Sequence, residues 1–272
     1  MRAKGAALAL PAVVGGAWVQ AHRAAHADVP QYDDLDVTGY YGPDPGPGQR
    51  RLRVAAVGDS TLTGPGLDHA RETFVARVAT GAGIPIHLTR HARGGSRIAD
   101  VLMRQLPAVL DHAPDVVVLS VGANDAVHST PLAQFERDVR AVVGALDRAG
   151  IETVVCGLID LSVIPRIPTA LRTLLRARGA AYERRKARAT HPAARAVHVE
   201  VGRRVNEVFR ARGEAFFTPD RFHPNREGHG CLAAALGPPF DAAVARAQAA
   251  VRSFPTSQSG SQFTAKYAAS NA

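Results

Sequence analysis

Two short stretches of this 272-residue chain carry side chains that could form a nucleophile and its base. Ser60 ends the stretch Val-Gly-Asp-Ser, and His223 lies three residues after Asp220 in Asp-Arg-Phe-His. A serine hydroxyl is a weak nucleophile until a base removes its proton, and an imidazole oriented by a carboxylate is such a base. Ser60, His223 and Asp220 could therefore attack an acyl carbon together. Read alone, Ser60 also fits a helix cap, and His223 also fits a surface histidine.

Two glycine-containing stretches could supply an oxyanion hole. Gly95 in Arg-Gly-Gly-Ser offers a backbone N–H that no side chain obstructs, and Asn124 in Gly-Ala-Asn-Asp offers a side-chain amide. Such donors stabilise the charge that develops on a carbonyl oxygen under attack. The alternatives are helix capping for Asn124 and a plain turn at Gly94 and Gly95. Which of the two glycines would donate stays open.

The segments between these stretches alternate between strand and helix patterns. Strands are expected at 52–57, 85–89, 115–121, 153–158 and 196–201, and helices at 72–80, 98–110, 131–149, 169–189, 205–212 and 227–251. Such alternation predicts a parallel sheet with right-handed crossovers. The run 52–57 is almost wholly apolar, as expected of a strand buried on both faces. Thr130 is expected to cap the helix at 131–149. Parallel strands end at one edge, where open α/β sheets bind ligands, so the loops after the first three strands are expected to meet there.

In these motifs the chain resembles the SGNH (GDSL-type) hydrolase family of lipases and esterases, over about 52–236. It is most similar to the small actinobacterial branch, whose members share an apolar N-terminus. The resemblance implies roles for five residues: nucleophile Ser60, base His223, orienting acid Asp220, and oxyanion-hole donors Gly95 and Asn124 beside the N–H of Ser60. The proposed chemistry of the residues and the family pattern therefore agree.

The same resemblance implies a flavodoxin-like, three-layer α/β/α sandwich around a parallel five-stranded sheet of strand order 2-1-3-4-5. It implies no metal and no cofactor. Two positions depart from the family pattern: Thr61 stands where the family often has leucine, and Arg90 with His91 stands where many members carry an asparagine before the glycine turn. We expect Thr61 to alter the packing behind Ser60. Because of the second departure, the sequence does not show which residues hold the Gly95 turn in place.

These residues predict a serine hydrolase that cleaves carboxylic esters of small molecules or lipids. An O-acetylated glycan of the cell envelope and a thioester are alternative substrates, and a non-catalytic envelope-binding protein that keeps the fold is a third reading. The segment 160–188 bears on the choice, because it follows the fourth strand at the catalytic edge. Its apolar residues suggest a wall for an acyl chain and are equally typical of ordinary core: Leu161, Val163, Ile164, Ile167 and Leu171.

The flanks differ in composition from the expected hydrolase domain at 51–251. Residues 1–27 have a basic start, an apolar span and a small-residue ending, which predicts a signal peptide or N-terminal membrane anchor, with a surface-packed helix as the alternative. The protein is therefore expected outside the cytoplasm, secreted or membrane-anchored. Residues 28–50 are rich in Pro, Gly and Asp and are expected to be a linker or wrapped arm without helix or strand. Residues 252–272 are expected to be disordered.

The formal net charge is +9, and eight basic residues fall between 166 and 188 beside one acid, Glu183. This excess could attract an anionic membrane or envelope surface, or simply solvate a helix face. No nucleic-acid-binding motif accompanies the charge, so no nucleic-acid partner is expected. The two cysteines, Cys156 and Cys231, lack the spacing of metal ligands. Two separate thiols are favoured over a disulfide between them.

Overall fold

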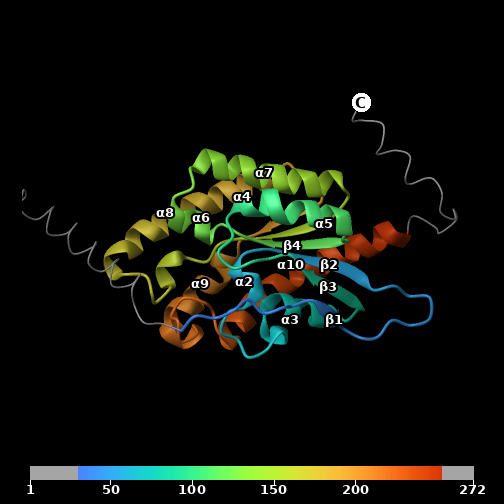
Figure 1. Ribbon diagram of the computed structural model, residues 1–272, viewed down its shortest axis with the longest axis horizontal. Coiled ribbons are helices and arrows are strands. Elements are labelled where there is room, and N and C mark those ends of the chain that lie inside the picture. The colour runs from blue at the N-terminus through green and yellow to red at the C-terminus, as the bar shows by residue number, and fades with distance from the viewer. Residues whose placement is uncertain (1–29, 253–272) are drawn as a thin grey trace, which may run out of the picture.

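A mixed sheet runs through the molecule, and helices cover both of its faces (Figure 1). The computed structural model describes residues 30–252. In sheet order the strands are β1 (Gly39–Tyr41), β3 (Ile86–Arg90), β2 (Leu52–Gly58), β4 (Val116–Ser120), β5 (Glu152–Cys156) and β6 (Ala196–Val199). Strands β2 to β6 are parallel, and β1 pairs antiparallel with β3 at the edge. The predicted fold class is confirmed, but the sheet has six strands where five parallel strands were predicted, because β1 adds an antiparallel strand at the edge. The five parallel strands keep the predicted order 2-1-3-4-5 among themselves.

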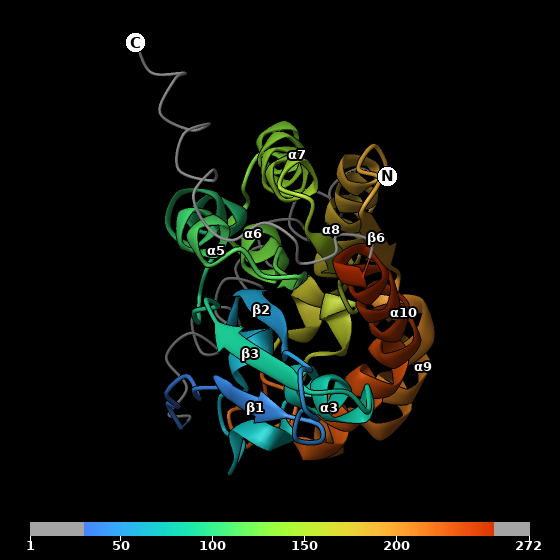
Figure 2. The ribbon, with the colours of Figure 1, turned by 90° about the vertical axis from the view of Figure 1, so that its right-hand side faces the viewer.

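The helices form one layer on each face of the sheet (Figure 2). One layer holds α3 (Phe74–Gly81), α9 (Val201–Arg212) and α10 (Arg226–Arg252), and the other holds α4 (Ile98–Asp100), α5 (Leu106–His112), α7 (Leu132–Arg148) and α8 (Thr169–Thr190). Short α2 (Ser60–Thr63) and α6 (Ala123–His128) follow β2 and β4, and 3-10 turns occupy Ala70–Glu72, Leu161–Val163 and Gly213–Phe216. Because both faces are covered, every residue of β4 is buried.

The start of α7 differs from the prediction. Thr130 does not cap this helix, because the N-cap position belongs to Pro131 and no side chain caps it. Short α6, which the sequence pattern did not reveal, ends at His128. Its C-cap residue Ser129 has a positive φ of 65°, so the chain reverses direction there. Thr130 is buried in this reversal, and its N–H donates to the Asp125 carbonyl oxygen at 3.0 Å.

A π-helical turn interrupts the helix expected at 98–110. It spans Val101–Gln105, between α4 and α5, and Pro107 lies in the first turn of α5. A π-helical turn holds one residue more than an α-turn, so it changes the direction in which the following side chains point. Gln105 is the last residue of this turn, and its polar side chain is buried against the end of β2.

Residues 30–50 contain a strand where none was expected. Gly39–Tyr41 pair with Ile86–Leu88 of β3, so the prediction of a segment without strand is wrong at this point. Val37 and Tyr41 are buried in the core, and the Tyr41 hydroxyl donates to the Val37 carbonyl oxygen at 2.8 Å. Aromatic residues favour strands, and here two tyrosines outweigh the Pro and Gly around them. The segment is therefore an arm that lies along the sheet edge.

The predictions for the chain ends lie outside the described residues. This applies to the signal or anchor segment at 1–27 and to the tail that follows α10. Among residues 30–252, no helix is both long enough and apolar enough to cross a membrane.

Candidate active site

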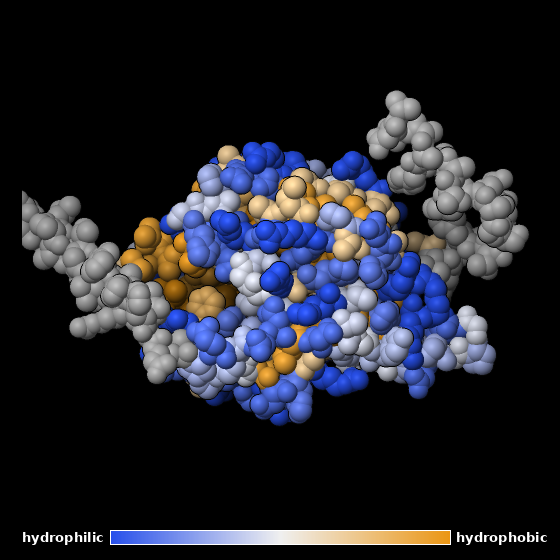
Figure 3. Space-filling view, viewed as in Figure 1, coloured by the Kyte–Doolittle hydropathy of each residue, from blue (hydrophilic) through white to orange (hydrophobic). Residues whose placement is uncertain are grey.

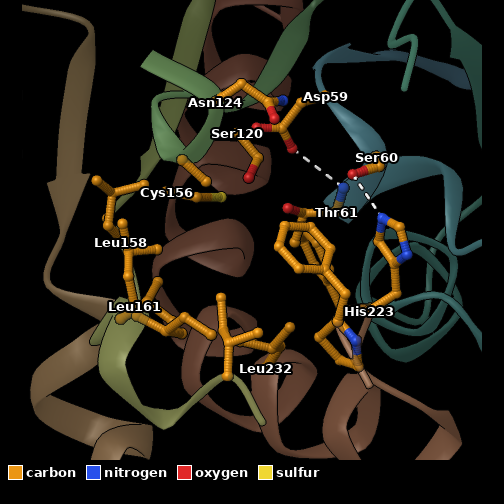
Figure 4. Close-up of a pocket in the computed structure, with 18 of the residues that line it drawn as sticks. Asp59, Ser60, Thr61, Ser120, Asn124, Cys156, Leu158, Leu161, His223 and Leu232 are labelled. Carbon is orange, nitrogen blue, oxygen red and sulfur yellow. Dashed lines mark hydrogen bonds between the residues drawn. The ribbon is translucent and has the colours of Figure 1, made fainter. Parts of the chain in front are cut away.

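Ser60, His223 and Asp220 lie together at the carboxyl end of β2. Ser60 is the first residue of α2, and its Oγ is 3.1 Å from His223 Nε2 (Figure 4). His223 Nδ1 is 2.6 Å from Asp220 Oδ2. Gly58 makes the abrupt end of β2 possible, because it has a φ of 139° and a Cβ there would lie 1.8 Å from the Ser120 carbonyl oxygen. The structure thus brings together the three residues predicted as a triad.

The Asp220 carboxylate is nearly surrounded by donors. Its Oδ1 accepts from Thr218 Oγ1 at 2.7 Å, from Phe222 N at 2.8 Å and from His223 N at 3.0 Å. Burial alone would raise the pKa of this carboxyl, but the hydrogen bonds from His223, Thr218 and the backbone outweigh burial and lower the pKa to about 2. Asp220 is therefore ionised at neutral pH, so it holds the Nδ1 proton of His223 and leaves Nε2 to accept from Ser60.

The two glycines that the sequence left open differ in their hydrogen bonds. The Gly94 N–H donates to Asp34 Oδ2 at 2.8 Å, so it is already engaged. The Gly95 N–H has no acceptor within the part of the chain that the structure describes, and Gly95 adopts a φ of 75° that favours glycine. Gly95 also lines the same open pocket as Ser60 and His223. Of the two, Gly95 is the available donor.

Asn124 lines the same pocket as Gly95 and lies in the first turn of α6. Gly122 occupies the N-cap of that helix, so Asn124 does not act as its cap. One hydrogen of its Nδ2 is donated to the Ser96 carbonyl oxygen at 3.1 Å, and an amide nitrogen carries a second hydrogen. The side chain thus holds the turn next to Gly95 and still has a hydrogen for another acceptor.

A second, more enclosed cavity extends from Ser60 into the core and is mostly apolar (Figure 4). Its apolar wall is formed by Phe74, Cys156, Leu158, Ile159, Leu161, Ile164, Val201, Phe222, Leu232 and Leu236. Thr61, the position that departs from the family pattern, also lines it. Of the five apolar residues predicted as a wall, Leu161 and Ile164 line this cavity and Ile167 lines the outer pocket. Val163 and Leu171 instead pack against the core.

The outer rim of the site is also apolar. Figure 3 shows apolar side chains gathered around a hollow at the end of the molecule where α8 begins. Val127, which lines the outer pocket, is 42% exposed. Val127, Tyr32 and Ile167 line the outer pocket together with Ser60.

Two supporting residues were missed by sequence reasoning. Gln105 accepts from Gly58 N at 2.8 Å, and its Nε2 donates to the Gly58 carbonyl oxygen at 2.9 Å and to Ser96 Oγ at 3.1 Å. It therefore joins the end of β2 to the Gly95 turn. Asp34 is the second, and it comes from the arm. A buried polar residue on an apolar helix face was a signal for Gln105, but nothing in the local sequence marked Asp34.

Buried ionisable groups surround the site without joining the triad. Burial, Arg77 and His223 lower the pKa of His229 to about 3, so this histidine is neutral and its Nδ1 accepts from the Phe74 N–H at 3.1 Å. Burial raises the pKa of the Cys156 thiol to about 12. Cys156 and Cys231 are separate free thiols, as favoured. Within residues 30–252, no group of three or more His, Cys, Asp or Glu side chains could hold a metal ion.

The fold and this site define a class of proteins: a doubly wound α/β sheet with a Ser-His-Asp chain of hydrogen bonds at its carboxyl edge. The chain belongs to the GDSL-like lipase/acylhydrolase family, whose model matches residues 56–231. The predicted family resemblance is therefore confirmed. The chain is 32% identical to the GDSL-like esterase Rv1075c of Mycobacterium tuberculosis over 208 residues, which are 72% of this chain and 66% of that protein. It thus spans just under two thirds of that relative's length.

Two solved structures have similar folds. One is a putative lipolytic protein of the G-D-S-L family from Desulfitobacterium hafniense, with a TM-score of 0.57 and 15% identity over 69% of this chain and 99% of that chain. The other is the acetylxylan esterase Axe2 from Geobacillus stearothermophilus, with a TM-score of 0.55 and 18% identity over 68% and 92% of the chains. At these identities the likeness concerns the fold.

Proposed function

We propose that this protein hydrolyses carboxylic esters with Ser60 as nucleophile, His223 as base and Asp220 as the acid that orients the base. The observation that carries the proposal is the unbroken chain of hydrogen bonds from Ser60 Oγ through His223 to Asp220, at 3.1 and 2.6 Å. Membership in a family of lipases and acylhydrolases supports it independently. The available N–H of Gly95 and the amide of Asn124 in the same pocket supply the second requirement, a site for the oxyanion.

The first half of the reaction forms an acyl-enzyme. His223 Nε2 takes the proton of Ser60 as Oγ bonds to the acyl carbon, and the carbonyl electrons move onto oxygen. That oxyanion accepts from the N–H groups of Ser60 and Gly95 and from the Asn124 amide. When the oxyanion collapses, the C–O bond to the alcohol breaks, and His223 gives its proton to the leaving alkoxide.

The second half repeats these steps with water. His223 takes a proton from a water molecule as the water oxygen attacks the acyl carbon. The bond to Ser60 Oγ then breaks, and His223 returns the proton to the serine. The carboxylic acid leaves, and the enzyme is restored.

The cavity beneath Ser60 favours an ester with an apolar acyl chain. Its wall is formed almost wholly by aliphatic and aromatic side chains, and such a wall stabilises a bound chain by about 0.8 kcal/mol for each buried methylene. An O-acetylated glycan is the second candidate, since one solved neighbour is an acetylxylan esterase. A sugar would need polar partners, and the polar residues of the cavity gather at the triad end: Asp59, Ser60, Thr61, Ser120, Asn124 and His223. The apolar wall therefore favours the acyl chain.

The test is a panel of p-nitrophenyl esters from acetyl to palmitoyl, assayed beside acetylated sugars, with Ser60→Ala as control. We expect kcat/KM to rise with chain length until the cavity is filled, and no turnover by Ser60→Ala. A preference for acetylated sugars would favour the deacetylase. Failure of a fluorophosphonate probe to label the wild-type protein would favour a non-catalytic binding protein.

We propose an extracytoplasmic location on the strength of the sequence of residues 1–27 alone. A reporter fused after Gln31 tests it, because export of the reporter is expected and wholly cytoplasmic retention would contradict it.

Binding to an anionic surface is a separate proposal, based on the net charge of +9. We expect the protein to sediment with anionic vesicles and not with neutral vesicles. High salt should abolish this binding, because it screens the charges.

A further inference from the structure

The arm that precedes β2 reaches the active site through one carboxylate. Asp34 Oδ2 accepts from the Gly94 N–H at 2.8 Å, and Asp34 Oδ1 accepts from Thr63 Oγ1 at 2.5 Å. Thr63 belongs to α2, the helix that begins with Ser60. The next arm residue is held as well, because the Leu35 N–H donates to the Thr63 carbonyl oxygen at 3.0 Å. One side chain of the arm therefore ties the helix of the nucleophile to the glycine turn.

That turn is closed by the hydrogen bond from the Ser96 N–H to the Arg93 carbonyl oxygen at 3.2 Å, but this bond is compatible with either direction of the middle peptide plane. The N–H that would face an oxyanion belongs to the peptide plane between Gly94 and Gly95, and glycine dihedrals are the least restrained in a chain. After this plane, Ser96 is held by Asn124 and Gln105 through its carbonyl oxygen and its hydroxyl. Before it, the Gly94 N–H has Asp34 as its acceptor. Asp34 thus restrains the plane from the side opposite to Ser96.

Arg90 strengthens the link between arm and turn. It is the last residue of β3. Its guanidinium is 3.8 Å from Asp34 Oδ2 and 3.6 Å from Asp36 Oδ1, and the Arg90 backbone N–H donates to Thr38 Oγ1 at 3.1 Å. A positive group this close offsets the negative charge of Asp34, which would otherwise oppose a nearby oxyanion. Arg90 therefore binds three residues of the arm at the end of the strand that leads into the glycine turn.

We propose that Asp34 is a positioning residue for the oxyanion hole, and that the arm is part of the catalytic unit although it precedes residues 56–231 that match the family model. The proposal rests on the proposed function. Asp34 touches neither substrate nor the reacting atoms; it acts by fixing the direction of the Gly95 N–H. Its loss should therefore slow the chemical step and leave substrate binding almost unchanged.

The test measures kcat and KM per active site, with the concentration of reactive Ser60 titrated by a fluorophosphonate so that misfolded protein does not count. Asp34→Ala is expected to lower kcat roughly tenfold or more, less than the 10²–10³-fold that complete loss of one donor costs, with KM nearly constant. Asp33→Ala, at the exposed neighbouring position, is the matched control and should leave kcat unchanged. Asp34→Asn keeps an oxygen for Gly94 and should restore most of kcat.

A second variant reaches the same contact from the other side. A Cβ on Gly94 would lie 2.8 Å from Asp34 Oδ1, and the backbone of Gly94 does not require a positive φ. Gly94→Ala should therefore push Asp34 away and lower kcat as Asp34→Ala does. In the double variant the losses should not add, because each change removes the same contact. Gly144→Ala, where a Cβ would meet nothing within 4 Å, is the control for the substitution itself.

Three results would overturn the proposal. The first two are an unchanged kcat per active site in Asp34→Ala and fully additive losses in the double variant. The third is a rise in KM alone, which would assign Asp34 to substrate binding. Failure of the proposed function looks different. In that case the wild-type protein would neither hydrolyse esters nor react with the fluorophosphonate, before any variant of the arm is compared.

Discussion

Replacing Asp220 by Asn is a specific test of the triad, because the hydrogen bonds around this residue fix the orientation of the new amide. Oδ1 of Asp220 accepts from three donors, so an Asn side chain must place its oxygen there. Its NH₂ group then occupies the position of Oδ2, 2.6 Å from His223 Nδ1. A donor at that place requires an unprotonated Nδ1, which puts the proton on Nε2. His223 can then no longer accept from Ser60.

The expected loss of activity follows from that tautomer. In a serine protease, the corresponding change of acid to amide lowers kcat about 10⁴-fold with the geometry intact. We expect a loss of roughly 10³–10⁴-fold in kcat here, measured with p-nitrophenyl esters. A variant that retained near wild-type kcat would show that the Nδ1 proton is held by another group, and the triad assignment of Asp220 would be wrong.

The same substitution should also change how the free energy of unfolding depends on pH. The pKa of Asp220 falls from its ordinary 3.8 to about 2, which corresponds to roughly 2.5 kcal/mol at about 1.36 kcal/mol per pH unit. Because the pKa is lowered in the folded state, this stabilisation is fully present above pH 3.8 and is lost as the pH falls through about 2. Asn cannot titrate. The difference in the free energy of unfolding between wild type and Asp220→Asn should therefore shrink by most of that roughly 2.5 kcal/mol as the pH falls from 6 to 2.

Urea unfolding followed by circular dichroism measures that difference from pH 6 to pH 2. Other carboxyls also have lowered pKa values, among them Asp36, Asp160 and Glu183, and they weaken both proteins alike. The comparison therefore isolates Asp220. A difference that stays constant over the whole range would refute the view that Asp220 is stabilised as an ion.

Three further variants or conditions test the same site. Ser60→Ala should abolish ester turnover and keep the fold, because it removes one hydroxyl, and wild-type-like turnover would exclude Ser60 as nucleophile. Asn124→Ala should lower kcat roughly 10²–10³-fold with a smaller change in KM, and an effect on KM alone would make Asn124 a binding residue. Wild-type kcat/KM should rise as His223 loses its proton and then stay level into mildly alkaline pH. A steady fall from pH 5 to pH 9 would exclude a neutral histidine base.

The fold was predictable because its signals are local and repeat along the chain. Five apolar runs alternate with helix patterns, and parallel pairing carries the end of each run to one edge of the sheet. For this reason the residues after β2, β3 and β4, which are Ser60, Gly95 and Asn124, line one pocket in the structure. The turn at Asp220 is equally local, since its carboxylate binds the backbone within three residues.

The contacts that Asp34 and Gln105 make with the site were not predictable, because they join residues far apart in the sequence. The contact between Asp34 and Gly94 joins residues 60 positions apart, and the Pro- and Gly-rich composition of the arm indicates no contact at all. Gln105 lies 47 positions from Gly58. Its place on the apolar stripe of the helix indicated a buried side chain, but nothing in that stripe indicated which backbone groups the side chain would bind.

The basic composition of residues 166–188 was likewise a poor guide to where these side chains lie. Eight basic residues between 166 and 188 suggested one solvated or anion-binding face. In the structure Lys186 is 1% exposed, and its Nζ donates to the Cys156 carbonyl oxygen at 2.8 Å beside the cavity. Arg185 pairs with Glu136, and Arg176 with Asp160. Burial lowers the pKa of Lys186, although Glu183 and other nearby acids partly counter this. Part of the basic run therefore serves the interior, and an attraction to anionic surfaces has to come from the remaining arginines.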